Sequence, residues 1–156
     1  PPHENCIIQG DCGYAPPELL YGAPGATWFA RRQGCDLYLL GSLVVFFFAG
    51  SAMTPEIMRG IPQTHHPSIW QGTYQEAMPH VRKAFGEALA RIRQNLGPEF
   101  REELMEIITQ LCEPDITRRG HPKGRGIQAQ QYSIERYVTI FDRMAFKATL
   151  TLPRKA

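Results

Sequence analysis

The chain has 156 residues, of which 43% are hydrophobic and 21% are charged, so it can form one domain with a buried core. Its formal net charge is only +2, and its 17 Lys and Arg residues are spread along the sequence. Nucleic-acid binding usually needs a concentrated basic patch, so we do not expect a nucleic-acid partner.

The longest apolar run, residues 37–49, is interrupted by Gly41 and Ser42 and is shorter than the ~20 residues that span a bilayer. No signal peptide precedes this run. We therefore expect a buried core helix, no membrane partner and a cytoplasmic location. The four cysteines have no CxxC spacing, which favours reduced thiols over a disulfide framework or a zinc site.

Residues 1–34 are predicted to be mostly loop, because proline and glycine recur through them. Residues 6–8 are expected to form a short strand and residues 17–21 one helical turn. A helix is then predicted from Asp36, as its N-cap, to Ala49, with a glycine ending it. Residues 51–73 are predicted to be irregular.

Regular helical patterns dominate the rest. Apolar residues recur with a 3.6-residue period over 74–95, and Gly97-Pro98 stops that helix and starts the next. Residues 113–131 are predicted to be loop and 133–150 the last helix. The last helix is expected to bury its apolar residues, which are Ile134, Tyr137, Val138, Phe141, Met144, Ala145 and Ala148. The predicted fold class is mainly α.

Three motifs occur in an informative order: Tyr14-Ala15-Pro16-Pro17-Glu18, then Asp36-Leu37-Tyr38-Leu39-Leu40-Gly41, then Leu111-Cys112-Glu113-Pro114-Asp115-Ile116-Thr117-Arg118-Arg119. A protein-kinase C-terminal lobe shows the end of its activation segment, its central buried helix and a later arginine-bearing loop in this order. The chain therefore resembles the C-lobe of a protein kinase, of the bacterial serine/threonine kinase-like or pseudokinase type.

The resemblance implies one kinase-like domain over residues 1–156, with an activation-segment remnant and loop at 1–35 and a helical core at 36–156. It also implies an ion pair between Glu18 and Arg119. If that pair is buried, loss of one partner costs ~3–5 kcal/mol. If both are surface charges, the pair is worth under ~1 kcal/mol. By the same resemblance Asp36 accepts hydrogen bonds from a catalytic loop, a role compatible with simple N-capping.

The resemblance further suggests two magnesium ligands. Asn5 matches the asparagine that closes a kinase catalytic loop, and Asp11 in Asp11-Cys12-Gly13 stands where Asp-Phe-Gly belongs. The spacing between them is much shorter than in kinases, and almost no activation segment remains. The alternative is that Asp11 is a turn residue, which suits Gly-Asp-Cys-Gly.

Most of the kinase chemistry has no counterpart in these residues. There is no Gly-rich loop, no Val-Ala-Ile-Lys strand, no His-Arg-Asp triplet and no GxxxxGK[ST] loop. We therefore expect no catalytic residues and no cofactor in this chain alone, with the N-lobe and most of the catalytic loop lacking. ATP and magnesium would bind only if the lobe were completed.

Three hypotheses remain open. The first is a non-catalytic, pseudokinase-like interaction or regulatory module whose partner is its own missing N-terminal half or another protein. The second is the C-terminal part of an active ATP-dependent serine/threonine kinase, completed by an upstream or partner segment. The third is an unrelated helical scaffold, in which Glu18 and Arg119 would lie far apart.

Overall fold

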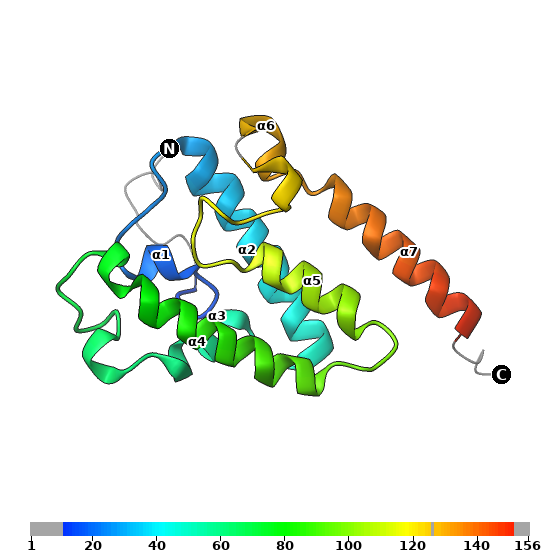
Figure 1. The fold of residues 1–156 in the computed structure, drawn as a ribbon, viewed down its shortest axis with the longest axis horizontal. Coiled ribbons are helices and arrows are strands. Elements are labelled where there is room, and N and C mark those ends of the chain that lie inside the picture. The colour runs from blue at the N-terminus through cyan, green and yellow to red at the C-terminus, as the bar shows by residue number, and fades with distance from the viewer. Residues whose placement is uncertain (1–10, 126, 152–156) are drawn as a thin grey trace.

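The computed structural model describes residues 11–125 and 127–151, and in these residues it contains helices and no strands (Figure 1). The mainly α prediction is confirmed. The short strand predicted at residues 6–8 lies outside the described residues. In chain order the helices are α1 (Pro17–Leu20), α2 (Trp28–Ala49), α3 (Met53–Gly60), η1 (Gln63–His65), α4 (Tyr74–Asn95), α5 (Arg101–Leu111), η2 (Pro122–Gly124), α6 (Gln128–Gln131) and α7 (Glu135–Thr151).

Helix α2 is the central element, and its predicted start is wrong. It begins at Trp28, because the Oγ1 of Thr27 accepts a hydrogen bond from the Ala30 amide at 3.1 Å and so caps the helix. Asp36 therefore lies inside the helix and not at its N-cap. The predicted end is correct, since Gly50 adopts a left-handed conformation with φ of 76° directly after Ala49.

The irregular segment predicted at residues 51–73 contains a helix, α3. Pro55 stands in its first turn, where a missing amide hydrogen removes no intrahelical bond, so the proline is compatible with helix. The Oγ of buried Ser42 accepts the Met53 amide at 3.0 Å and joins the start of α3 to α2. Helix α3 packs closely against α4.

Helix α4 has the predicted bounds, 74–95. A reciprocal capping box fixes its start, in which the Thr73 side chain accepts the Glu76 amide and Glu76 accepts the Thr73 amide. Helix α5 follows after Gly97-Pro98, with Glu102 and Glu103 in its first turn as its dipole favours. The core lies among α2, α3, α4 and α5, and includes Leu37, Val45, Ile57, Val81, Ala88, Ile92, Leu104, Ile107 and Leu111.

The C-terminal part differs from the prediction in two ways. The segment predicted as loop, 113–131, contains the short helices η2 and α6. Helix α7 buries Tyr137 and Met144 but leaves Val138 about half exposed and Ala145 exposed. Ile134, just before the helix, is also about half exposed, so the predicted buried face is wrong in part. Figure 1 shows the reason: α7 runs along one side of the bundle as an outer element and is not enclosed by other helices.

The length argument against a membrane-spanning helix also needs correction. Helix α2 has 22 residues and is long and apolar enough to cross a membrane by length and composition alone. One of its faces, however, is buried against the other core helices, with Gly34, Leu37, Tyr38, Gly41, Ser42, Val44 and Val45 inside.

Candidate functional site

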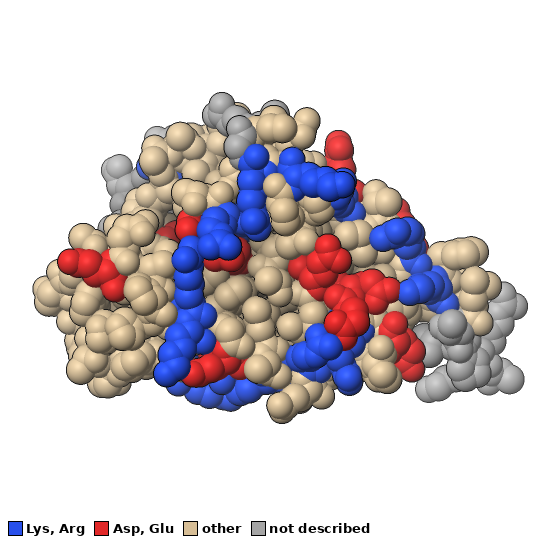
Figure 2. All heavy atoms as spheres, in the orientation of Figure 1, with Lys and Arg blue, Asp and Glu red and all other residues tan. Residues whose placement is uncertain are grey.

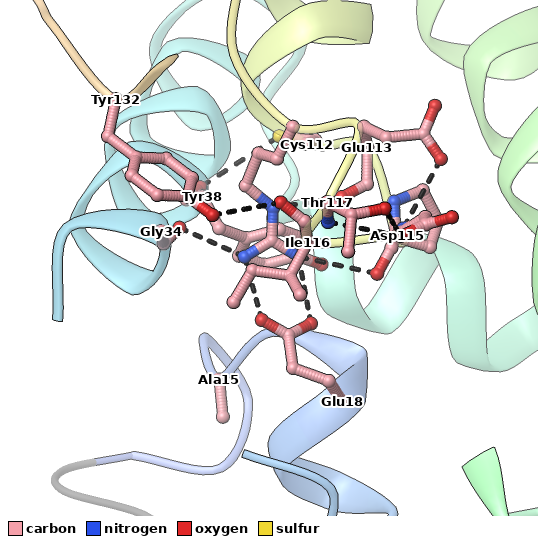
Figure 3. A network of polar contacts seen from close by, with 12 residues as sticks. Ala15, Glu18, Gly34, Tyr38, Cys112, Glu113, Asp115, Ile116, Thr117 and Tyr132 are labelled. Carbon is pink, nitrogen blue, oxygen red and sulfur yellow. Dashed lines mark hydrogen bonds and ion pairs between the residues drawn. The ribbon is translucent and has the colours of Figure 1, made fainter. Parts of the chain in front are cut away.

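The centre of the candidate site is an ion pair between segments far apart in the sequence. Figure 3 shows the Glu18 carboxylate pointing from α1 toward the loop after α5. Arg119 Nη1 donates to Glu18 Oε1 at 2.7 Å, and Nη2 donates to Oε2 at 2.8 Å. The exposed fractions of the side chains are 0% for Arg119 and 2% for Glu18. The arrangement is a buried bidentate pair, which excludes the alternative of two surface charges.

The remaining donors of Arg119 are satisfied by backbone carbonyl groups. Its Nε donates to the carbonyl of Glu113 at 2.8 Å, and Nη1 also donates to the carbonyl of Gly34 in α2 at 2.9 Å. The guanidinium lies 5.1 Å from the centre of the Tyr38 ring. Burial alone would lower the pKa of Arg119, but the charge of Glu18 raises it above its ordinary value, so the side chain stays cationic.

A buried hydroxyl chain connects the first motif to α2 and α3. The hydroxyl of Tyr38 lies 2.9 Å from Thr54 Oγ1, and Thr54 Oγ1 donates to the carbonyl of Ala15 at 2.8 Å. Burial raises the pKa of Tyr38 well above its usual value, which keeps the phenol neutral and able to donate. Sequence reasoning missed Thr54, because it lies in the segment predicted to be irregular.

Asp36 does not have the capping role predicted for it. It is exposed in the middle of α2, and none of the described residues forms a hydrogen bond or ion pair with it. Among the described residues, no backbone amide donates a hydrogen bond to the Asp36 carboxylate in the way that a kinase catalytic loop would. Asp36 is therefore separate from the Glu18–Arg119 pair, although the same resemblance singled out all three residues.

The exposed side of α2 is apolar. Leu39, Leu43, Phe46 and Phe47, which we call the α2 stripe, follow Asp36 at helical spacing and share a face opposite the buried one. Their exposed fractions are 39%, 46%, 47% and 72%. A helix that is apolar on both sides is typical of one enclosed by other elements, so the exposure of the stripe departs from an ordinary soluble surface.

Of the two suggested magnesium ligands, the structure describes only Asp11. Asn5 lies outside the described residues. Asp11 is exposed, and its Oδ1 accepts the Gly13 amide at 2.8 Å, which is the geometry of the turn alternative. Among the residues that the structure describes, no three His, Cys, Asp or Glu side chains are grouped as metal ligands would be.

A hollow of about 410 Å³ lies beside the first motif. It is lined by Cys12 and Gly13 before α1, by Thr54 and Met58 of α3, and by the segment that includes His66. The lining is mainly apolar and contributes no group of charged side chains. The arrangement can accommodate a small apolar group, and its lining residues include no Lys or Arg.

Comparisons with known proteins identify no relative. No family model, no curated protein and no solved structure matches the chain. The sequence motifs and the contacts of the described residues are therefore the basis on which a function is assigned.

Proposed function

We propose that this chain is a kinase-like C-lobe that acts in the cytoplasm as a non-catalytic interaction module. Its partner would be an N-terminal half of the same protein or another subunit, seated on the α2 stripe. The observation that carries the proposal is the stripe itself: four large apolar side chains are exposed on the helix whose opposite face forms the core.

The size of the exposed apolar residues supports a docking role. Burial of a Leu or Phe side chain contributes ~1.5–3 kcal/mol, so a partner that covers the stripe gains a large part of the free energy that a stable complex needs. Exposed apolar patches of this kind typically mark interaction surfaces or aggregation sites. Asp36 at the head of the stripe adds an exposed carboxylate that has no ion-pair partner among the described residues, which favours a partner with a donor at that end.

The absence of phosphate-binding motifs supports a non-catalytic role for the chain alone. Phosphoryl transfer needs a phosphate cradle, a lysine on the phosphates, a positioning carboxylate and magnesium ligands. Of the two suggested ligands, Asp11 is engaged in a turn. The residues with the strongest structural roles, Glu18 and Arg119, are inside the protein, where they stabilise the lobe and touch no solvent.

Asp36 favours the alternative of a kinase completed by another segment. In the family that the chain resembles, this aspartate accepts backbone hydrogen bonds from the catalytic loop, and here its carboxylate is exposed and accepts no hydrogen bond from the residues that the structure describes. Under this alternative, Asp11 and Asn5 would hold magnesium after completion. Addition of the completing segment would then give phosphotransfer activity that Asp11→Ala abolishes.

The test of the first proposal is thermal melting of the purified chain with and without magnesium and ATP. A ligand at about 100 times its dissociation constant adds ~2.7 kcal/mol to stability, which raises the Tm of a domain of this size by roughly 5–11 °C. We expect no saturable rise. A saturable rise that Asp11→Ala removes would refute the non-catalytic proposal and support the kinase alternative.

A further inference from the structure

The apolar side of α2 is longer than the α2 stripe. Trp28 and Phe29, in the first turn of the helix, are 53% and 40% exposed. They lie on the same side of the helix as the stripe, because Phe46 and Phe47 each follow them by 18 positions, which is five full turns of an α-helix. We call the α2 stripe together with Trp28 and Phe29 the extended α2 face.

The extended α2 face differs from the charged side of the molecule. Figure 2 shows side chains of both charges mixed over the side on which α4 and α5 face the viewer, as on an ordinary solvated surface. In α2, by contrast, only Arg31, Arg32 and Asp36 are charged among 22 residues. Contact with water therefore does not account for the composition of this helix.

The exposed apolar area is sufficient for a contact between two copies of the chain. The six side chains of the extended α2 face are 39–72% exposed. If a large apolar side chain offers ~200 Å² when fully exposed, two copies that cover this face bury roughly 600 Å² on each and roughly 1,200 Å² together. This total is at the lower end of specific, stable interfaces, so a reversible dimer is expected.

The order of residues along the extended α2 face favours a second copy as the occupant. An aromatic pair stands at each end, with Trp28 and Phe29 at one end and Phe46 and Phe47 at the other. A two-fold contact places the same surface of both copies against each other, so that surface must be self-complementary. In an antiparallel arrangement, the first aromatic pair of each copy packs against the second aromatic pair of the other.

Two charged residues set the direction of this contact and argue against a bilayer. Arg32 and Asp36 are both exposed and lie one turn apart, between the aromatic pairs. A parallel arrangement would place Arg32 against Arg32 and Asp36 against Asp36, whereas an antiparallel one brings four charges that sum to zero around the two-fold axis. A bilayer interior would instead receive the Asp36 carboxylate, which is costly.

We propose that the extended α2 face binds a second copy of this chain in an antiparallel, two-fold symmetric contact. The inference rests on the proposed function, since it names the partner of the α2 stripe. Analytical ultracentrifugation of the full chain tests it. We expect a reversible monomer–dimer equilibrium with a dissociation constant of roughly 10 μM, because interfaces near the lower size limit are commonly weak.

The variants are Leu43→Asp and Phe47→Asp, both at exposed positions, so the monomer should keep the helical circular-dichroism spectrum and the Tm of the wild type. Each should weaken dimerisation by about 100-fold or more, because the contact would bury an unpaired carboxylate. The matched control is Phe146→Asp. Phe146 lies on α7 outside the extended α2 face, and its 66% exposure is close to the 72% of Phe47, so this variant should dimerise as the wild type does.

Orientation is tested by cysteine cross-linking. A disulfide should form faster in a mixture of Phe29→Cys and Phe46→Cys chains than in either variant alone, because the antiparallel contact brings these two positions together. Equal rates would overturn the antiparallel contact.

A wild-type chain that stays monomeric at roughly 100 μM, or a folded Phe47→Asp variant that dimerises undiminished, would overturn the proposal. Sedimentation of the monomer with phosphatidylcholine vesicles would assign the face to a lipid surface and would also overturn it. These results leave the melting test with ATP and magnesium unaffected, so the non-catalytic proposal stands or fails separately.

Discussion

Replacement of Arg119 by Met tests the part of the structure that connects the most distant segments. The substitution keeps much of the side-chain volume and removes the charge. Glu18 would then be a buried carboxylate with no cation, and the carbonyl groups of Gly34 and Glu113 would lose their donor. Because α1, α2 and the loop after α5 meet at this guanidinium, the loss affects all three.

The expected cost can be estimated from these contacts. Removal of one partner of a buried ion pair costs ~3–5 kcal/mol, since the other charge is left uncompensated. Each buried carbonyl that loses its donor adds ~1 kcal/mol or more unless water reaches it. The sum, ~5–7 kcal/mol, is comparable to the whole stability of a marginal domain, so Arg119→Met should be largely unfolded or close to it.

Urea unfolding followed by circular dichroism measures the effect, with a double-mutant cycle to isolate the pair. Glu18→Gln removes the negative charge of the pair and keeps Arg119, and the double variant removes both charges. We expect the double variant to be more stable than Arg119→Met alone, because it no longer buries an unpaired carboxylate. A loss below ~1 kcal/mol for Arg119→Met, or strictly additive effects, would refute the reasoning.

Three further predictions concern the packing and titration of the core. Gly41→Ala should destabilise the protein by ~1–3 kcal/mol, because the new Cβ would lie 2.5 Å from Cys112 Sγ. The control is Gly86→Ala, whose new Cβ would have no atom within 4 Å. It should stabilise the protein by ~0.5–1 kcal/mol in the same unfolding assay. Thr54→Val should lower the free energy of unfolding by ~1–3 kcal/mol, because the Tyr38 hydroxyl and the Ala15 carbonyl both lose a hydrogen-bond partner. Unchanged stability would argue against the buried chain of hydroxyl groups. Burial raises the pKa of Cys35 from 9.0 to about 11, so the unfolded chain releases this proton first and stability should fall as pH rises from about 9 to 11. A Cys35→Ala variant should show a shallower fall of Tm with pH, and an equal fall in both proteins would contradict this assignment.

Local signals in the sequence are sufficient for some elements of the fold. The bounds of α4 follow from a regular apolar period and from Thr73 and Glu76, which form the capping box that the sequence spacing suggests. The end of α2 follows from Gly50. These features depend on residues within one or two turns of each other, so the sequence alone contains the required information.

Other elements depend on contacts that the sequence does not display. The start of α2 is hard to predict because Arg31 and Gly34 obscure the apolar pattern, while tertiary packing buries Gly34 and keeps the helix continuous. Helix α3 is hard to predict because a proline such as Pro55 usually ends a helix, although in the first turn it removes no intrahelical hydrogen bond. Ile134 has the right spacing for a core face, but no neighbouring helix covers it.

The candidate site divides in the same way. The kinase-like motifs placed Glu18 opposite Arg119 across the chain, and the two side chains are in contact. The motifs give no signal for the exposure of the α2 stripe, because exposure depends on which elements surround α2.

Hydrogen exchange at the Arg119 guanidinium, followed by NMR of the arginine Nε–H groups, tests the central contact most directly. The structure places this side chain at 0% exposure between a carboxylate and two carbonyl groups. We therefore expect its Nε–H to exchange orders of magnitude more slowly than that of exposed Arg31 in the same spectrum. Equal exchange rates for Arg119 and Arg31 would contradict the buried ion pair and remove the support that it gives to the proposed kinase-like fold.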